Sequence, residues 1–183
     1  MKAMKTKMLI FVFLLGITDL FAQTLYVPGA IVKGKNTSYY CSFENKLLVK
    51  VNNINNVDTT TTMYYDDGTA LPSYKELGGT ITTKTEDLVR VFQEALTQEE
   101  IDILKSKISY SLLLDIVADK QGNTLEITFS FRSNDPVMTK LDPDRLYQLE
   151  QNLKKILKLN PSKADSSIKN MKYIQAISYK DLK

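Results

Sequence analysis

The sequence contains no histidine and no tryptophan, and only one of its 183 residues is a cysteine. Without histidine the chain cannot form a Ser-His-Asp triad or a Cys-His pair, and it lacks the usual acid-base group of neutral pH. A single cysteine excludes an internal disulfide, a redox dithiol and a zinc site built from several thiolates. These absences predict a protein that is not an enzyme and needs no cofactor.

Glycine is sparse as well, with seven residues scattered along the chain and no Gly-x-x-x-x-Gly-Lys phosphate-binding loop. Carboxylates are the remaining catalytic chemistry, and Asp66 and Asp67 could form a paired-acid site or supply oxygen ligands to a cation. However, Asp-Asp-Gly between Tyr65 and Thr69 is typical of a hairpin turn, which is the interpretation we favour. A carboxylate-dependent hydrolase is therefore the weakest of our functional hypotheses, and we predict no metal site.

The first 22 residues have the pattern of an export signal. Three lysines precede an apolar run from Met8 to Ile17, and Leu20-Phe21-Ala22 precedes Gln23 as a cleavage site. The apolar run is shorter than the roughly 20 residues of a transmembrane helix. We predict that residues 1–22 are cleaved and that the protein is periplasmic or secreted, without a stable membrane anchor. An uncleaved N-terminal anchor is the alternative.

Removal of the signal leaves a nearly neutral chain. The signal carries three of the 24 basic and one of the 21 acidic residues, so the mature chain has 21 basic and 20 acidic residues, a net charge of +1. Such a chain has no electrostatic reason to bind nucleic acid or an anionic membrane. The one cysteine, Cys41, lies among alternating aromatic residues, which predicts a buried strand position. A nucleophile or an intermolecular thiol is the alternative.

The second half of the chain has a clear strand-turn-strand pattern. Apolar residues occupy alternate positions in two runs, which are Ile108, Tyr110, Leu112, Leu114 and Ile116, then Leu125, Ile127, Phe129 and Phe131. Residues 119–123 between them include Gly122, which suits the positive φ of a tight turn. We predict a hairpin, with Glu126 on its solvated face.

Helical signals surround this hairpin. Thr85 is the expected N-cap of a first helix, and Thr97 with Glu100 forms a capping box for a second. Asp142 is the expected N-cap of a third helix with Pro143 at its first position. An apolar stripe on this third helix predicts contact with the hairpin, near Phe129, and places Lys154 in solvent; its members are Leu146, Leu149, Leu153, Ile156 and Leu157.

Together these patterns predict an α+β two-layer sandwich, with an antiparallel sheet and helices packed on one face. The expected order over residues 77–183 is helix, helix, strand, strand, helix, strand, and the last strand is Lys172 to Tyr179. Short β-branched and aromatic runs separated by turn residues make 23–76 a β-rich N-terminal segment. We therefore divide the chain into 1–22, 23–76 and 77–183.

This order resembles a known family. Leu77-Gly78-Gly79, the turn at 119–123 and Leu141-Asp142 at the head of a helix are similar to the C-terminal domain of TonB-type proteins over residues 77–181. The chain also resembles short uncharacterised exported proteins of gut Bacteroidota, through its Leu-x-x-Glu-Glu pattern followed by two strands around a turn glycine. The first resemblance implies the α+β fold, and the second implies no known activity.

The tyrosines supply the candidate binding residues. Tyr39, Tyr64, Tyr65 and Tyr74 are amphipathic rings that bind peptides or sugars when exposed, although such rings also fill strand faces. Our leading hypothesis is an exported, non-catalytic cell-envelope protein that binds a protein or peptide partner. The alternative is binding of a glycan or another small molecule through these tyrosines. The sequence makes no prediction of the oligomeric state.

Overall fold

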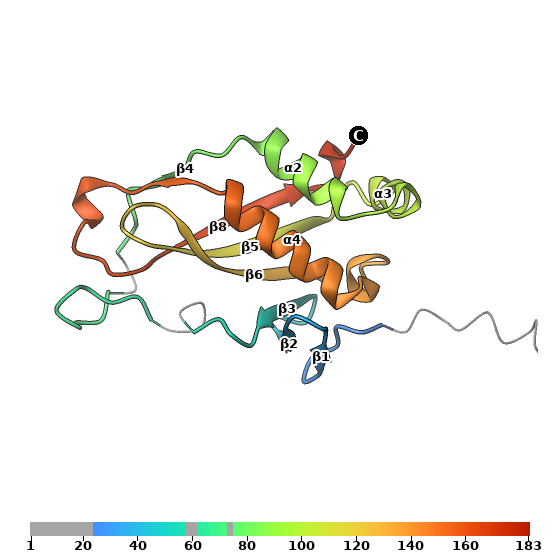
Figure 1. The fold of residues 1–183 in the computed structure, drawn as a ribbon, viewed down its shortest axis with the longest axis horizontal. Helices are drawn as coiled ribbons and strands as arrows, with labels where there is room; N and C mark the ends of the chain where they lie inside the picture. The colour runs from blue at the N-terminus through green and yellow to red at the C-terminus, as the bar shows by residue number, and fades with distance from the viewer. Residues whose placement is uncertain (1–23, 58–61, 73–74) are drawn as a thin grey trace, which may run out of the picture.

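The computed structural model of the chain describes residues 24–57, 62–72 and 75–183 (Figure 1). The predicted export signal and Tyr74 lie outside the described residues. Six strands form one antiparallel sheet in the order β1-β2-β3-β6-β5-β8, and β4 and β7 form a separate two-stranded sheet. The α+β class predicted from the sequence is confirmed.

The elements follow one another along the chain as strands, then helices, then strands and one long helix. The strands are β1 Ile31–Lys33, β2 Ser38–Phe43, β3 Leu48–Asn53, β4 Thr80–Ile81, β5 Ser111–Ala118, β6 Thr124–Arg132, β7 Leu159–Asn160 and β8 Met171–Ser178. The helices are α2 Thr85–Glu94, α3 Gln98–Lys105 and α4 Pro143–Ile156, and the 3-10 turns are η1 Met138–Lys140, η2 Lys163–Asp165 and η3 Tyr179–Asp181.

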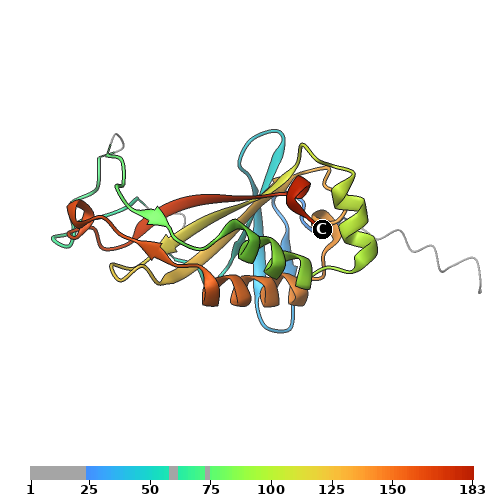
Figure 2. The same cartoon turned by 90° about the horizontal axis from the view of Figure 1, so that it is seen from above.

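The core lies between the sheet and two helices. Figures 1 and 2 show α2 and α4 along the same side of the sheet, which we call the inner face. Phe92 of α2, Leu153 of α4 and Phe129 of β6 are fully buried in one apolar cluster. The expected burial of Phe129 and Leu153 is confirmed. The opposite side, which α2 and α4 do not cover, is the outer face.

Capping residues in the sequence predicted the first residues of α3 and α4 correctly and that of α2 to within one residue. The Asp142 carboxylate accepts hydrogen bonds from the Asp144 and Arg145 amides at 2.9 and 3.2 Å, with Pro143 at the first helical position. Both bonds of the capping box between Thr97 and Glu100 are present. Thr85, predicted as an N-cap, is instead the first residue of α2, because the chain enters the helix one residue earlier.

The β5–β6 turn packs closely against the chain that follows α4. Gly122 has φ +80°, and Asp119 Oδ1 accepts hydrogen bonds from the Gln121 and Asn123 amides. The Leu159 amide donates to the Gly122 carbonyl at 3.1 Å, and a Cβ on Gly122 would lie 2.0 Å from the Leu159 oxygen. The turn therefore touches the chain that leaves α4.

Two expectations about solvent exposure are wrong. Glu126 is buried on the outer face, because residues after β3 run beside β6 and the Val57 amide donates to its Oε1 at 2.7 Å. Lys154 is not simply solvated, since its Nζ lies 2.6 Å from the buried Glu150 carboxylate. At the hairpin ends, Ile108 precedes β5 and is exposed, and Leu125 is exposed as well.

The strands of the predicted N-terminal segment belong to the main sheet. β3 pairs with β6 from Leu48 opposite Arg132 to Asn52 opposite Thr128. Tyr26, which precedes β1, is buried with its ring 6.0 Å from that of Phe131 in an edge-on contact. Residues 24–53 thus complete the core that residues 77–183 begin.

Candidate functional site

The carboxylates that offered catalytic chemistry form a turn. The Tyr65 amide donates to the Thr69 carbonyl, Gly68 has φ +84°, and the Thr69 amide donates to Asp67 Oδ1 at 2.8 Å. This bond from the Thr69 backbone lowers the pKa of Asp67, so its carboxylate stays ionised rather than serving as an acid. Over the described ranges, no three histidine, cysteine, aspartate or glutamate side chains are grouped so that they could hold a metal ion.

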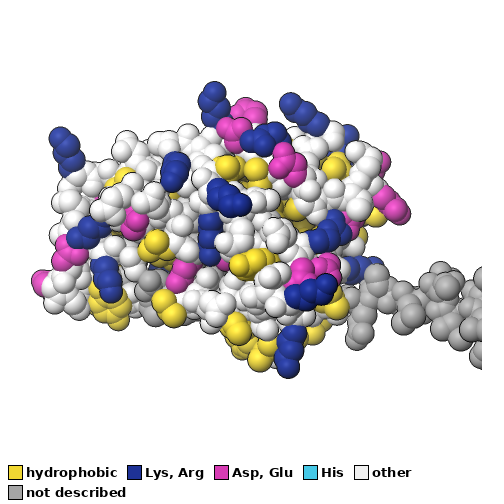
Figure 3. All heavy atoms as spheres, viewed as in Figure 1, with side chains coloured by type: hydrophobic (Ala, Val, Ile, Leu, Met, Phe, Trp, Pro, Cys, Tyr) yellow, Lys and Arg dark blue, Asp and Glu magenta, His cyan; other side chains and the backbone are white. Residues whose placement is uncertain are grey.

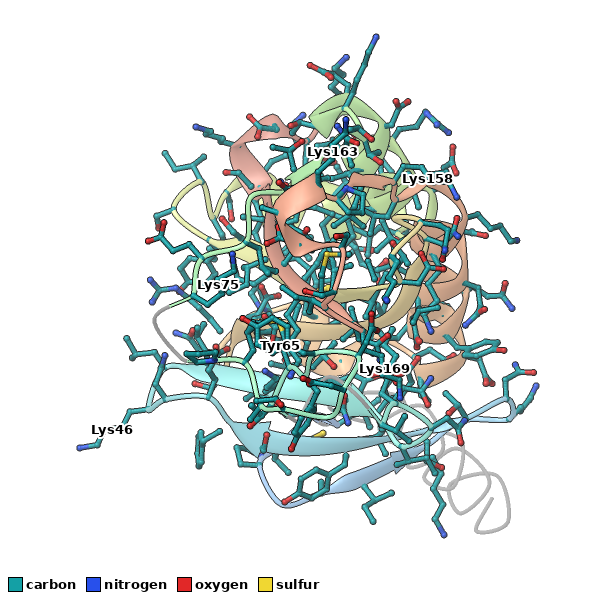
Figure 4. All side chains as sticks on the ribbon, turned by 90° about the vertical axis from the view of Figure 1, so that its left-hand side faces the viewer. Lys46, Tyr65, Lys75, Lys158, Lys163 and Lys169 are labelled. Carbon is teal, nitrogen blue, oxygen red and sulfur yellow. The ribbon has the colours of Figure 1, made fainter. Side chains whose placement is uncertain are left out.

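The candidate tyrosines do not form one surface. Tyr39 is fully buried, and its hydroxyl donates to Glu150 Oε2 at 3.0 Å, so its inclusion in an exposed surface was wrong. Alternation alone could not show which side of β2 the helices cover. Tyr64 is 43% exposed, whereas Tyr65 is half-buried beside a hollow of about 440 Å³. In Figure 4 Tyr65 lies between the labelled Lys75 and Lys169.

Tyr39 belongs to a buried polar cluster under α4. Glu150 Oε2 accepts from the Tyr39 hydroxyl and from Asn53 Nδ2, at 3.0 and 2.9 Å, and Glu150 Oε1 faces Lys154. Burial, together with the nearby Glu150 charge, raises the pKa of Tyr39 far above its usual range. The polar groups of this cluster bond to one another, so the cluster holds α4 against β2 and β3.

Cys41 lies next to this cluster and is fully buried on the inner face, as predicted. Burial raises the pKa of its thiol to about 11, which leaves almost no thiolate at neutral pH. Cys41 is therefore a packing residue of β2 and not a nucleophile.

The outer face is the side of the sheet that α2 and α4 do not cover, and it is exposed mainly at its two ends. One register row crosses all six strands through Ile31, Tyr40, Asn52, Thr128, Asp115 and Ile174. The centre of this row is polar. There Thr128 of β6 is buried, and the Lys50 ammonium of β3 lies 2.5 Å from the Asp115 carboxylate of β5, on the other side of β6. The two ends of the row are apolar and exposed, with Ile31 and Tyr40 at the β1 edge and Ile174 at the β8 edge.

The β8 edge also presents outward backbone amides, while the outward carbonyl of Ala176 accepts a hydrogen bond from Gln175 Nε2 at 2.9 Å. The Tyr179 amide donates to the Tyr110 carbonyl at 3.1 Å, so by alternation the odd-numbered residues of β8 hydrogen-bond to β5. Ile174 and Ala176 then direct their amides outward, where no described residue accepts a hydrogen bond from them. The Ile174 side chain at this edge is 71% exposed. Together these groups make the open side of β8 the candidate site.

Sequence reasoning missed this edge as a specific site. It predicted a last strand near Lys172 to Tyr179, but the neighbour of that strand and its open side depend on the sheet order. The alternation of Ile174, Ala176 and Ser178 with larger residues was the available signal. No helix in the described part of the chain has both the length and the apolar character needed to cross a membrane.

Comparisons with known proteins bear on the fold. No family model matches the sequence, and no curated protein matches it. Among solved structures, the chain is similar to a DUF5043 family protein from Bacteroides uniformis ATCC 8492, with a TM-score of 0.67 and 15% identity over 85% of this chain and 88% of that one. At this identity the likeness shows the fold alone. The chain thus shares its fold with an uncharacterised Bacteroidota protein, in agreement with the Bacteroidota resemblance, whereas the TonB resemblance stays a prediction.

Proposed function

We propose that this is an exported, non-catalytic cell-envelope protein, periplasmic or secreted, that binds an extended segment of a protein or peptide partner along the free edge of β8. The outward amides of Ile174 and Ala176 carry the proposal, because they have no acceptor among the described residues. In strand addition, such groups bond to the backbone of the partner, and alternate side chains supply specificity.

The two edges of the sheet differ in their suitability for this role. β1 has three residues and follows Pro28, and short strands and proline are common ways to prevent edge pairing. β8 has eight residues, contains no proline and keeps an unbroken register with β5 from Ser178 to Met171. Of the two outermost strands of the six-stranded sheet, β8 therefore offers the longer template to an extended partner.

The side chains of β8 indicate the chemistry of the partner. Ile174 and Ala176 point to the outer face, where Leu113 lies directly opposite Ala176 on β5. A partner strand with apolar residues at alternate positions would extend this row and cover Ile174. The proposal includes the resemblance of residues 77–183 to the C-terminal domain of TonB-type proteins, in the order helix, helix, strand, strand, helix, strand, which stays a prediction.

A proline substitution separates edge binding from folding. Ala176→Pro removes an amide that the β5 ladder does not use, so we expect the fold to persist, with a loss of unfolding free energy below about 1 kcal/mol. The same proline blocks a partner strand. Proteins captured from envelope extract by immobilised mature protein should be lost with Ala176→Pro and reduced with Ile174→Ala, as quantified by mass spectrometry.

Ile108→Ala is the matched control, because Ile108 is about as exposed as Ile174 but lies outside the edge, before β5. It should capture the same proteins as the parent chain. A synthetic peptide with the sequence of the bound segment of a captured protein should then bind the parent chain and not the Ala176→Pro variant. Equal capture by Ala176→Pro and the parent chain would exclude the β8 edge as the binding site.

A further inference from the structure

The turn that contains Asp66 and Asp67 lies against a segment that is distant in the sequence. The Asp66 amide donates to the Ser167 carbonyl at 2.8 Å, and the Lys169 amide donates to the Tyr64 carbonyl at 2.9 Å. These bonds hold the turn beside the chain that leads into β8. The turn lies at the end of the molecule that is at the left of Figure 1 and faces the viewer in Figure 4.

The hollow of about 440 Å³ lies between these two segments, and we call it the Tyr65 hollow. It is lined by Tyr65, Asp66, Asp67, Thr69 and Ser167. Small-ligand sites usually have volumes of about 300 to 1,000 Å³, so the hollow has the size of such a site. One tyrosine, two aspartates and two residues with a hydroxyl group therefore share one opening.

Tyr65 is a fixed wall of the hollow. It packs against the second apolar cluster of the protein, which consists of Leu71, Ile168 and Met171. It is nonetheless only half-buried, so part of the side chain stays open to a ligand. A tyrosine held in this way offers an apolar ring to a ligand beside polar groups.

The two aspartates of the hollow are oriented before any ligand binds. Lys120, in the β5–β6 turn, forms an ion pair with Asp66 Oδ2, and the Thr69 amide donates to Asp67 Oδ1 at 2.8 Å. A carboxylate has two oxygens with about four acceptor positions, so each aspartate can still accept hydrogen bonds from ligand hydroxyls. Groups that are already oriented reduce the entropy cost of binding.

The charges around the hollow are nearly balanced. Lys120 offsets one aspartate of the turn, and the Lys75 ammonium lies 3.4 Å from the buried Asp165 carboxylate. Asp67 and Lys169 have opposite charges. Figure 3 shows basic and acidic side chains interspersed at the left-hand end of the molecule. Such surroundings favour an uncharged ligand that has both an apolar C–H surface and several hydroxyls.

We propose that the Tyr65 hollow binds a neutral sugar residue of a glycan. The C–H face of the sugar ring lies on Tyr65, and its hydroxyls donate hydrogen bonds to Asp66 and Asp67. The hydroxyls of Thr69 and Ser167 supply further hydrogen bonds at the rim. A neutral sugar combines the two properties that the hollow requires, because hydroxyls surround a ring whose faces carry C–H groups.

This inference does not depend on the proposed binding at β8. The lining of the hollow includes Ser167 but no residue of β8, which begins at Met171. Ala176→Pro should therefore leave sugar binding unchanged, and Tyr65→Ala should leave partner capture unchanged. Failure of one proposal is distinguishable from failure of the other.

Isothermal titration calorimetry tests the proposal with the mature chain that begins at Gln23. The probes are the neutral oligosaccharides maltohexaose, cellohexaose, mannohexaose and xylohexaose, with hexagalacturonate as the anionic comparison. We expect at least one neutral probe to bind. Hexagalacturonate should bind at least about tenfold more weakly than that probe, because its carboxylates cannot donate hydrogen bonds to Asp66 and Asp67.

Two neighbouring tyrosines give a matched pair of variants. Tyr65→Ala should weaken binding of the neutral probe at least about tenfold, and Tyr65→Phe should stay within about threefold of the parent chain because it keeps the ring. Tyr64→Ala is the control, since Tyr64 is 43% exposed but does not line the hollow. It should bind the probe like the parent chain.

Asp67→Asn is a second test, which leaves the apolar cluster beside Tyr65 intact. The amide oxygen of asparagine can still accept from the Thr69 amide, so the turn should persist, but the carboxylate is lost as an acceptor. Binding should weaken by about fivefold or more. No binding of the parent chain to any of the four neutral probes would overturn the proposal. Equal losses for Tyr64→Ala and Tyr65→Ala, or unchanged binding by Asp67→Asn, would overturn it as well.

Discussion

At the residue scale, two turn glycines with the same backbone conformation have different surroundings. Gly68 and Gly122 have φ values of +84° and +80°. A Cβ on Gly68 would meet nothing within 4 Å, whereas a Cβ on Gly122 would meet the backbone of Leu159. Backbone atoms, unlike the end of a flexible side chain, cannot shift without a substantial cost in free energy.

We therefore expect Gly68→Ala to cost about 1 to 2 kcal/mol, which is the strain of a left-handed alanine. Gly122→Ala adds an overpacking cost of about 1 to 3 kcal/mol, so its total loss should be about 2 to 5 kcal/mol. Urea denaturation of both variants and the parent chain measures these losses. Equal losses would show that the hairpin turn and the chain after α4 do not approach each other as described.

Exposure is the residue property that the sequence predicted least well. Glu126 was expected in solvent because it alternates with Ile127 and Phe129, yet residues after β3 cover it. Tyr39 was a candidate for a binding surface, with burial on a strand face as the alternative, and it is buried and donates to Glu150. A period of two assigns residues to faces, but it does not show what another segment places on each face.

At the element scale, one arginine fastens α4 to the junction between α2 and α3. Arg145 donates to both carboxylate oxygens of Glu100, at 2.9 and 2.5 Å, and through Nε and Nη2 to the Ala95 carbonyl, at 3.2 and 2.7 Å. The hydrogen bonds from Arg145 lower the pKa of Glu100. The same carboxylate caps α3, so this contact joins three helices.

We expect Arg145→Ala to reduce the unfolding free energy by about 1 to 2 kcal/mol at pH 7, since the ion pair is partly exposed. Because the folded pKa of Glu100 is lowered, its share of the stabilisation is present above the ordinary glutamate pKa of about 4.3 and is lost as the pH falls through the folded pKa. The hydrogen bonds from Arg145 to the Ala95 carbonyl persist at low pH, because the carbonyl is not ionisable. The difference between parent and variant should therefore shrink, without vanishing, when urea denaturation is repeated near pH 3.

Arg90→Ala provides the comparison, because Arg90 pairs with Asp87 and Glu94 on the exposed side of α2. Its loss should be below about 0.5 kcal/mol at either pH. A loss for Arg145→Ala that is equally small, or that does not change with pH, would mean that the ion pair to Glu100 does not hold the helices together.

The helices were more predictable than the short strands for a physical reason. The caps at Asp142 and Thr97 depend on residues within four positions, so the sequence contains their whole signal. β4 and β7 have two residues each and exist because the chain before α2 runs beside the chain after α4. Nothing in a two-residue sequence specifies a partner 80 positions away.

At the scale of the whole molecule, β1, β2 and β3 share one sheet and one core with β5, β6 and β8. Tyr26 contacts both Tyr39 and Phe131 edge-on, with ring centroids 6.4 and 6.0 Å apart. Removing residues before 77 would expose β6 as a new edge and uncover Phe131 on the inner face. The boundary expected at 76 and 77 therefore crosses a common core.

We expect a chain of residues 77–183 to lack a cooperative unfolding transition by circular dichroism, because it loses the strand that pairs with β6 and the rings that cover Phe131. The mature chain from Gln23 should unfold in one sharp transition. If residues 77–183 alone melted cooperatively near the temperature of the mature chain, they would be an independent domain, and the first three strands would be an addition to it.

The order of the sheet has a further consequence, for the time at which the chain folds. The β1–β2–β3 and β5–β6 pairings are local, but β3 pairs with β6 about 80 residues later and β5 pairs with β8 about 60 residues later, so the six-stranded sheet is completed only when β8 is available. Chains dominated by such distant pairings fold slowly, because long loops must close before the contacts that stabilise them form. We therefore expect the chain to reach its final packed state late, after β8 has been synthesised. That delay suits a chain which, as we propose, must pass through a membrane before it takes its final shape.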